Sequence, residues 1–429
     1  MSQLRRRLFA TILAAALVAF AAPVTSLSVE AAGEGGTPPD TWAPARALPA
    51  RGGGAVLALA VDPRDPRRVL AGTTGGAVDL STDGGATWRT VRSGLAGGVL
   101  ALAFDPFVAG LVLAGSGGDG IWASKDGGES WSRAAGGGSG PVRAFAFAPD
   151  LALAGTDHGV WAGRGVGPWS PSGLDGVAVS ALAAWGGTGQ PPQVLAGGDG
   201  GGETVVPLYR SLDGARTWVP FTGAVGASTM VAALAAGPPA PGQNAPALLL
   251  GTNAGLFASG DGGASWQQLT GGGALPPADF TAVAFAPQDP QRLYVASDGG
   301  GSSGGGLWVS GDGGAHFTPL QPPAPSVTAL AVAGGSTPVL YAATLRPSDQ
   351  AVQVWSYLDA GGAPGRPQRP RSATGGHAAR SPAPTPAPVR DRLAAWLRRP
   401  ETPYLGLGAL AALVVLLALV TYVRRERQL

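Results

Sequence analysis

Short apolar runs alternate with glycine-rich polar turns along most of the chain. Val99–Phe104 and Leu111–Ala114 form one pair of such runs, and Ile121-Trp122 begins a third. Apolar runs of about four to six residues that are bounded by Gly, Pro and Asp are typical of short β-strands. A fourth strand is expected after the aromatic residue that ends the next polar turn. The pattern therefore predicts units of four strands.

The polar turn between the third and fourth predicted strands recurs along the chain. Its intact aspartates are 43 to 51 residues apart, except for a gap of 87 residues from Asp126 to Asp213 that leaves room for two repeats. Three copies read Ser-x-Asp-x-Gly-x-x-Trp, and two more depart from this pattern at one position. A repeat of this length that contains four strands predicts the blades of a β-propeller. The residues of the five copies are Ser81, Asp83, Gly85 and Trp88; Ser124, Asp126, Gly128 and Trp131; Ser211, Asp213 and Trp218; Ser259, Asp261, Gly263 and Trp266; and Ser310, Asp312, Gly314 and Phe317.

Two worn copies of the turn bring the count to seven. One ends at Trp169 and has lost its Ser and Asp, and the last retains Asp359 but has no aromatic residue after it. Trp42, ahead of the first full repeat, supplies the missing aromatic residue. We therefore expect residues 41–48 to form the outer strand of the last blade. The expected fold is an all-β, seven-bladed β-propeller of four-stranded antiparallel blades, and closing the ring removes an exposed sheet edge.

The repeated turn resembles the Asp-box, or BNR, repeat. On this basis residues 41–362 are similar to the propellers of the photosystem II stability/assembly factor group and to sortilin- and sialidase-type propellers. The aspartate of such a turn can accept backbone N–H bonds, its glycines allow positive φ, and its aromatic residue can pack between blades. We therefore interpret the Asp-box residues as structural.

Both ends of the chain carry features of an exported membrane protein. Residues 1–32 place three arginines before an Ala- and Leu-rich stretch, which is typical of a signal peptide. The general and twin-arginine export routes both remain open. Residues 404–423 are an uncharged, mostly apolar run, long enough for a transmembrane helix, and residues 424–429 would be its cytoplasmic tail. We expect a single-pass plasma-membrane protein with the propeller on the extracytoplasmic side.

A spacer separates the predicted propeller from the predicted membrane helix. Residues 363–389 are a Pro/Gly/Ala/Arg-rich linker without the apolar content of a packed core. Residues 390–403 form a juxtamembrane segment, either a short interfacial helix or a simple turn. Pro400-Glu401-Thr402 partly resembles a sortase signal, but its flanking residues do not match that signal.

Charge and composition narrow the range of functions. Residues 41–358 contain 15 Lys and Arg against 20 Asp and Glu, a net charge of −5, so the propeller lacks the basic balance that nucleic-acid binding requires. The chain has no cysteine, which removes disulfides, thiol catalysis and cysteine-bound metals. We expect no cofactor, no metal and no nucleic-acid partner, and the oligomeric state stays open.

Catalytic residues of the sialidase kind cannot be matched one by one to this sequence, so we expect no catalytic site. Glycine-rich insertions lengthen several hairpins between second and third strands, on the face opposite the Asp-boxes. Loops of unequal length on a rigid scaffold often carry binding sites. Neutral insertion of glycine into exposed turns is the alternative explanation. The candidate binding-face residues are Asp157, Asp199, Glu203, Asp298 and Asp349.

The sequence favours a non-catalytic binding or scaffold protein outside the cell. Its partner would be a protein or a glycan. The resemblance to the assembly-factor group implies help in assembling a membrane complex. The alternative is a glycoside hydrolase of the sialidase or endoglucanase kind, acting on extracellular glycans. Two acids grouped with an Arg or Tyr would favour that alternative.

Overall fold

The computed structural model describes residues 39–362 except 46–47, 49–53, 187–188, 199–207, 222–228, 240–244, 277, 301–304, 336 and 347–350. The predicted signal peptide, linker, juxtamembrane segment, transmembrane helix and cytoplasmic tail lie outside the described residues. Within the described part of the chain, no helix is long and apolar enough to cross a membrane.

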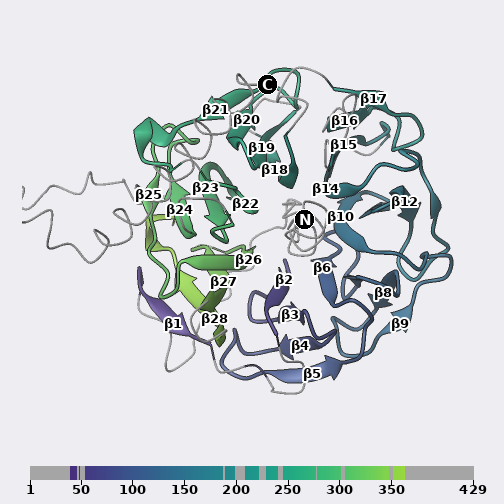
Figure 1. Ribbon diagram of the computed structural model, residues 1–429, viewed down its shortest axis with the longest axis horizontal. Helices are drawn as coiled ribbons and strands as arrows, with labels where there is room; N and C mark the ends of the chain where they lie inside the picture. Colours follow the sequence, from purple (N-terminus) through teal and green to yellow (C-terminus); the bar gives the residue numbers. More distant parts are fainter. Residues whose placement is uncertain are drawn as a thin grey trace, which may run out of the picture. The chain divides into compact units, whose positions relative to one another are not determined.

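Seven four-stranded antiparallel sheets follow one another around a ring, which confirms the predicted seven-bladed propeller (Figure 1). Each blade begins with its inner strand and ends with its outer strand. Blade 1 contains β2 (Val56–Val61), β3 (Val69–Thr73), β4 (Val78–Ser81) and β5 (Arg89–Arg92). Blade 2 contains β6 (Val99–Phe104), β7 (Val112–Ser116), β8 (Ile121–Ser124) and β9 (Ser132–Arg133). Blade 3 contains β10 (Val142–Ala148), β11 (Leu151–Thr156), β12 (Gly159–Gly163) and β13 (Ser170–Pro171). Blade 4 contains β14 (Val179–Trp185), β15 (Gln193–Gly198), β16 (Leu208–Ser211) and β17 (Val219–Pro220).

The remaining blades follow the same order, except that the last takes its outer strand from the N-terminal end. Blade 5 contains β18 (Val231–Pro239), β19 (Pro246–Thr252), β20 (Gly255–Ser259) and β21 (Gln267–Leu269). Blade 6 contains β22 (Ala282–Ala286), β23 (Asp289–Ser297), β24 (Gly306–Ser310) and β25 (Thr318–Pro319). Blade 7 contains β26 (Ser326–Ala333), β27 (Val339–Arg346), β28 (Ala351–Leu358) and β1 (Trp42–Pro44). Two short 3₁₀ helices among the described residues are η2 (Gly271–Gly273) and η3 (Ala360–Gly362).

The N-terminal strand closes the ring by pairing with the last strand of the repeat series. In β1, Trp42 lies opposite Tyr357 and Pro44 lies opposite Trp355 of β28. The indole N–H of Trp42 donates to the carbonyl of Leu320 at 2.8 Å, and its ring lies 4.9 Å from the ring of Tyr357. The two ends of the repeat series are therefore held in one sheet.

The inner strands are apolar on both sides because each blade is covered by a neighbour on either face. All six residues of β6 and all seven of β14 are buried. Alanine is frequent at these positions, so neighbouring blades can approach closely near the ring axis. A strand that is packed on both faces reads as a continuous apolar run instead of a strict alternation.

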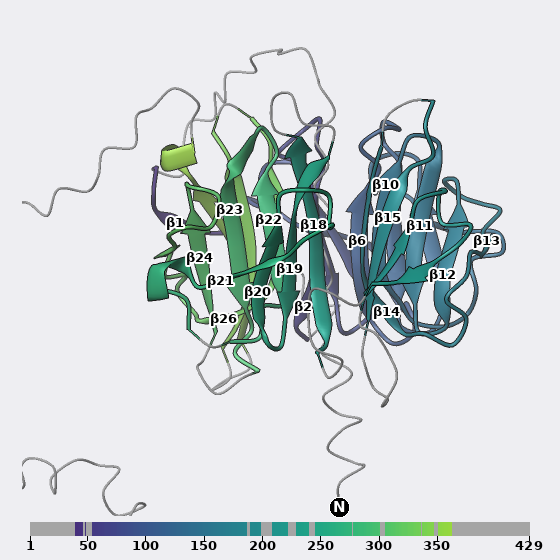
Figure 2. The same cartoon turned by 90° about the horizontal axis from the view of Figure 1, so that it is seen from above.

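The turns gather on two opposite faces of the ring (Figure 2). We call the face that carries the first-to-second and third-to-fourth strand turns the box face. The other face, which we call the connection face, carries the second-to-third strand turns and the segments that lead from one blade to the next. This division follows from the antiparallel order of the strands in every blade.

Candidate functional site

The Asp-box carboxylates on the box face are occupied by hydrogen bonds from their own turns. Asp83 accepts from the Ser81 hydroxyl at 2.8 Å, from the Thr87 backbone N–H at 2.8 Å and from the Thr87 hydroxyl at 2.5 Å. The Gly85 backbone N–H donates to the Ser81 hydroxyl at 2.8 Å. The same Ser and backbone contacts recur at Asp126, Asp213, Asp261 and Asp312. These carboxylates are therefore bonded within their own turns.

The hydrogen bonds favour the ionised form of the box aspartates. The hydroxyl of Thr217, followed by its backbone N–H, lowers the pKa of Asp213 from 3.8 to about 2. The hydroxyl and backbone N–H of Ser265 lower the pKa of Asp261 to about 2 in the same way. Hydrogen bonds donated to a carboxylate stabilise its charged form and therefore lower its pKa.

Asp359 differs from the other box aspartates, because its partners come from the preceding blade. Arg292 of β23 donates to it from Nε at 2.8 Å and from Nη2 at 2.6 Å, and the Tyr294 hydroxyl donates at 2.6 Å. Asp359 is 1 % exposed and Arg292 is 8 % exposed, so the pair is buried. Burial, reinforced by the charge of Asp359, raises the pKa of Tyr294 well above its usual value. Asp359 therefore joins blade 7 to blade 6.

The structure describes two of the five predicted binding-face residues, and it does not bring them together. Asp157 of blade 3 forms an ion pair with Arg143, with Nε–Oδ1 at 2.5 Å and Nη2–Oδ2 at 3.2 Å. Asp298 of blade 6 accepts the backbone N–H of Gly300 at 2.9 Å. Both lie on the connection face, directly after a second strand. The remaining predicted residues, Asp199, Glu203 and Asp349, lie outside the described residues.

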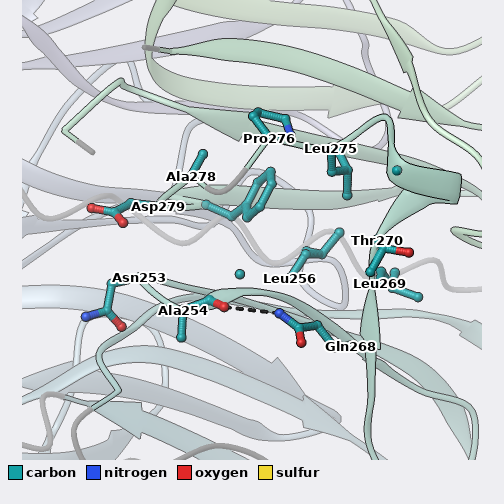
Figure 3. Close-up of a pocket in the computed structure, with 13 residues that line it drawn as sticks. Asn253, Ala254, Leu256, Gln268, Leu269, Thr270, Leu275, Pro276, Ala278 and Asp279 are labelled. Carbon is teal, nitrogen blue, oxygen red and sulfur yellow. Dashed lines mark hydrogen bonds between the residues drawn. The ribbon is translucent and has the colours of Figure 1, made fainter. Parts of the chain in front are cut away.

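A cleft of about 660 Å³ opens on the connection face between blades 5 and 6 (Figure 3). Three segments form it: the turn between β19 and β20, the strand β21, and the connection from β21 to β22. Its walls combine the side chains of Leu256, Leu269, Leu275, Pro276, Ala278 and Phe280 with the polar side chains of Asn253, Gln268, Thr270 and Asp279. Apolar walls with a few polar groups are typical of ligand sites.

Hydrogen bonds fix the shape of the cleft on its blade 5 side. The amide oxygen of Asn253 accepts the backbone N–H of Met230 at 2.8 Å. Gln268 donates from Nε2 to the carbonyl of Ala254 at 3.2 Å, which ties the outer strand to the turn (Figure 3). The turn itself is closed by Thr252, whose hydroxyl accepts the Ala254 N–H at 3.0 Å. The polar rim of the cleft is therefore built on short, internally bonded turns.

Asp279 is the charged residue of the cleft, and it was not among the predicted site residues. Burial, followed by the charge of Asp298, raises its pKa above 3.8. A comparison of the blades could have found it. The residues three positions before a shared inner-strand alanine are Ala55, Gly98, Pro141, Ala178, Met230, Asp279 and Ser326, so Asp279 is the one charged residue in this series.

Two carboxylates of blade 6 therefore interact beside the cleft. A Cβ atom on Gly300 would be 3.3 Å from Asp298 Oδ1 and 4.0 Å from Asp279 Oδ2, so both carboxylates lie close to this glycine. None of the thirteen residues that line the cleft is basic. In the described part of the chain, no group of three or more His, Asp or Glu side chains could hold a metal ion. The site can bind through hydrogen bonds and a negative charge.

Comparison with known proteins supports the fold and leaves the function open. No protein-family model and no curated protein matches the chain. A GH74 xyloglucanase from Xanthomonas campestris has a similar structure, with 21 % sequence identity over 73 % of this chain and a TM-score of 0.53. The match spans only 55 % of the xyloglucanase, so this chain corresponds to about half of that enzyme.

Propellers of other kinds match equally well. YCF48, in a structure with a bound D1 peptide, shares 15 % identity over 74 % of this chain and 97 % of its own, with a TM-score of 0.52. The WD40 repeats of RRP9 share 16 % identity over 74 % of this chain and 97 % of their own, with a TM-score of 0.54. Similar structures thus include an enzyme, a protein with a bound peptide and a set of WD40 repeats, and at these identities they show the fold alone.

Proposed function

We propose that this protein is a non-catalytic binding protein that presents its propeller on the extracytoplasmic side of the plasma membrane, held there by residues 404–423. Its partner would be a protein or a glycan, and binding would aid the assembly of a membrane complex. The connection face would carry the binding site, and the Asp-box turns of the box face would serve only to stabilise the fold.

The cleft between blades 5 and 6 is the observation that carries this proposal. Its walls offer hydrogen-bonding side chains from Asn253, Gln268 and Thr270 beside apolar surface. The Asp-box carboxylates on the other face are instead occupied by their own turns. The similarity to YCF48, which has been seen with a bound peptide, supports a protein partner.

Site-specific photo-crosslinking in the native membrane tests the proposal. A photoreactive amino acid is placed at Thr270, which is exposed in the cleft, or at Lys125, which is exposed in an Asp-box on the other face. We expect Thr270 to crosslink to a defined partner and Lys125 not to do so. Crosslinks from Lys125 alone would place the binding surface on the box face and contradict the proposal.

A glycoside hydrolase is the second candidate, favoured by the interacting carboxylates of Asp279 and Asp298. Glycosidases use two carboxylates, one of which has a raised pKa and acts as a general acid. Xyloglucan and sialosides should be tested as substrates of the full-length protein and of the Asp279→Asn and Asp298→Asn variants. Turnover that both substitutions abolish would establish this candidate in place of the binding protein.

A further inference from the structure

The cleft between blades 5 and 6 has two chemically different ends (Figure 3). Figure 3 shows the side chains of Asn253 and Asp279 toward the same end of the cleft. Leu269 and Leu275 lie at the other end, where both are half-buried, and Thr270 is beside them. A ligand that fills the cleft therefore meets polar groups at one end and apolar groups at the other.

The polar end offers one acceptor and one donor that the described protein leaves free. The Asn253 side chain is held through its oxygen by the Met230 backbone N–H, at 2.8 Å, which leaves its NH₂ group to donate elsewhere. Burial, followed by the charge of Asp298, raises the pKa of the Asp279 carboxyl group. Its carboxylate receives no hydrogen bond from the described residues. A half-buried carboxylate without a donor is costly unless a ligand supplies one.

The charge at this end is uncompensated within the cleft. Asp298, which directly follows β23 of blade 6, adds a second negative charge close to Asp279. Two other aspartates lie on described second-to-third strand turns: Asp157 pairs with Arg143, and Asp119 accepts the Ala96 backbone N–H at 2.8 Å. Both have a donor within the protein, whereas Asp279 has none among the described residues. The complementary ligand carries a positive charge, because such a group would gain a charge-assisted hydrogen bond.

We propose that the Asn253–Asp279 end of the cleft recognises a lysine or arginine side chain in an extended segment of a partner protein. The ammonium or guanidinium group donates to Asp279, and a backbone carbonyl of the segment accepts from the Asn253 NH₂ group. An apolar residue next to the basic one packs on Leu269 and Leu275. This inference rests on the proposed binding function and names the chemistry of its partner.

A polypeptide fits this arrangement better than a sugar does. An extended chain carries a basic side chain, a backbone carbonyl and an apolar side chain within a few ångströms of one another. A neutral glycan would supply hydroxyl groups to Asn253 and Gln268 but no cation for Asp279. A volume of about 660 Å³ is within the range of pockets that hold small ligands or a short peptide segment.

The test uses the full-length protein and four fluorescein-labelled peptides, Gly-Pro-Leu-X-Leu-Pro-Gly, in which X is Arg, Lys, Gln or Glu. Binding is measured by fluorescence anisotropy at neutral pH. We expect the Arg and Lys peptides to bind about tenfold tighter than the Gln peptide, because a hydrogen bond between charged groups is stronger than one from a neutral donor. The Glu peptide should bind most weakly.

Three variants link the preference to Asp279. Asp279→Asn, which keeps the shape of the side chain, should bring the Arg and Lys peptides to the affinity of the Gln peptide. Asp279→Lys should reverse the preference in favour of the Glu peptide. Asp175→Asn is the matched control, because Asp175 is an exposed carboxylate in the connection between blades 3 and 4, on the same face. This variant should keep the wild-type preference.

The outcomes separate this inference from the proposed function. Equal affinities for the Arg and Gln peptides, or a preference that survives Asp279→Asn, would overturn the inference and leave cleft binding intact. Failure of all four peptides to bind would also overturn it, and the crosslinks from Thr270 would then judge the proposed function independently. Thermal unfolding of each variant shows whether a loss of binding comes from a loss of folding.

Discussion

Gly128 illustrates the backbone requirement of the Asp-box turn at the scale of a single residue. Its φ is 96°, in the left-handed region, and a Cβ atom there would lie 2.9 Å from Leu70 Cδ1. We expect Gly128→Ala to lower the free energy of unfolding by about 1–3 kcal/mol, because both the backbone and Leu70 must adjust. Urea-induced unfolding of the two proteins measures the difference.

Blade 4 provides the matched control for that substitution. Ala215 occupies the corresponding position, is fully buried and already has a φ of 68°. Ala215→Gly should leave stability unchanged or raise it by less than about 1 kcal/mol, because relief of the positive φ is offset by a more flexible unfolded chain. If Ala215→Gly destabilised the protein as much as Gly128→Ala does, backbone strain would not be the cause.

Acid should weaken the Asp-box turns through their low-pKa aspartates. The folded pKa of Asp213 and of Asp261 is about 2, below the unmodified value of 3.8. Their contribution to stability is therefore complete above the unfolded pKa and is lost as the pH falls toward 2. Asp213→Asn should lower the urea midpoint at pH 6, and this difference should shrink as the pH approaches 2. A difference that stayed constant with pH would show that ionisation of Asp213 is unimportant.

The contacts between side chains could not be predicted from the sequence, least of all where the two residues lie in different blades. Asp359 was predicted from its repeat position, but its contact with Arg292 depends on how blade 6 meets blade 7. Asp157 and Asp298 were predicted as binding-face residues from their loop positions, and those positions gave no sign of the ion pair between Asp157 and Arg143. Asp279 was missed because it is a single aspartate before a strand and belongs to no recognisable sequence motif. Only comparison of the same position in all blades distinguishes it.

At the scale of elements, an arginine before or within a second strand links one blade to the next. Arg292 of blade 6 bonds Asp359, and Arg68 of blade 1 donates to the carbonyl of Gly127 in blade 2 at 2.9 Å. Both arginines follow Asp-Pro-x, in Asp65–Arg68 and Asp289–Arg292, so the sequence places them equivalently. The link between blades 6 and 7 differs from the link between blades 1 and 2 because its arginine, Arg292, is buried and only 8 % exposed.

Breaking the buried link should cost more than breaking an exposed ion pair. Arg292→Ala leaves the carboxylate of Asp359 buried without its cation, which typically costs about 3–5 kcal/mol. Arg67→Ala removes the exposed pair of Arg67 with Asp65 and should cost less than about 1 kcal/mol. Unfolding free energies of the two variants give the comparison. Similar losses for both would show that burial of the link between blades 6 and 7 contributes little.

At the scale of the whole molecule, the seven-bladed ring followed from counting the repeated turns. Each blade forms its own Asp-box turn, so the motif recurs once in every blade. Degenerate copies of the motif could therefore be recognised from their spacing along the chain. The cleft could not be placed in this way, because its walls come from blade 5 and from the connection that leads to blade 6. Turn chemistry is local in sequence, whereas a groove between blades depends on loop conformations that the repeat does not constrain.

The N-terminal strand should decide whether the ring stays closed. Without β1, blade 7 would end at β28 and expose an unpaired strand edge, which favours association with other chains. The chain should therefore be prepared without residues 1–45, which removes β1, and separately without residues 1–38, which retains it. We expect the shorter protein to unfold at a lower temperature and to aggregate.

The two truncated chains differ by only seven residues, so their comparison isolates the closing strand. The longer one keeps the indole of Trp42 bonded to Leu320 and packed on Tyr357, which joins the start of the chain to blades 6 and 7. Light scattering and thermal unfolding should show a difference between them. Equal stability and solubility would mean that the ring is held by packing between blades alone, and that β1 covers an edge whose exposure the protein tolerates.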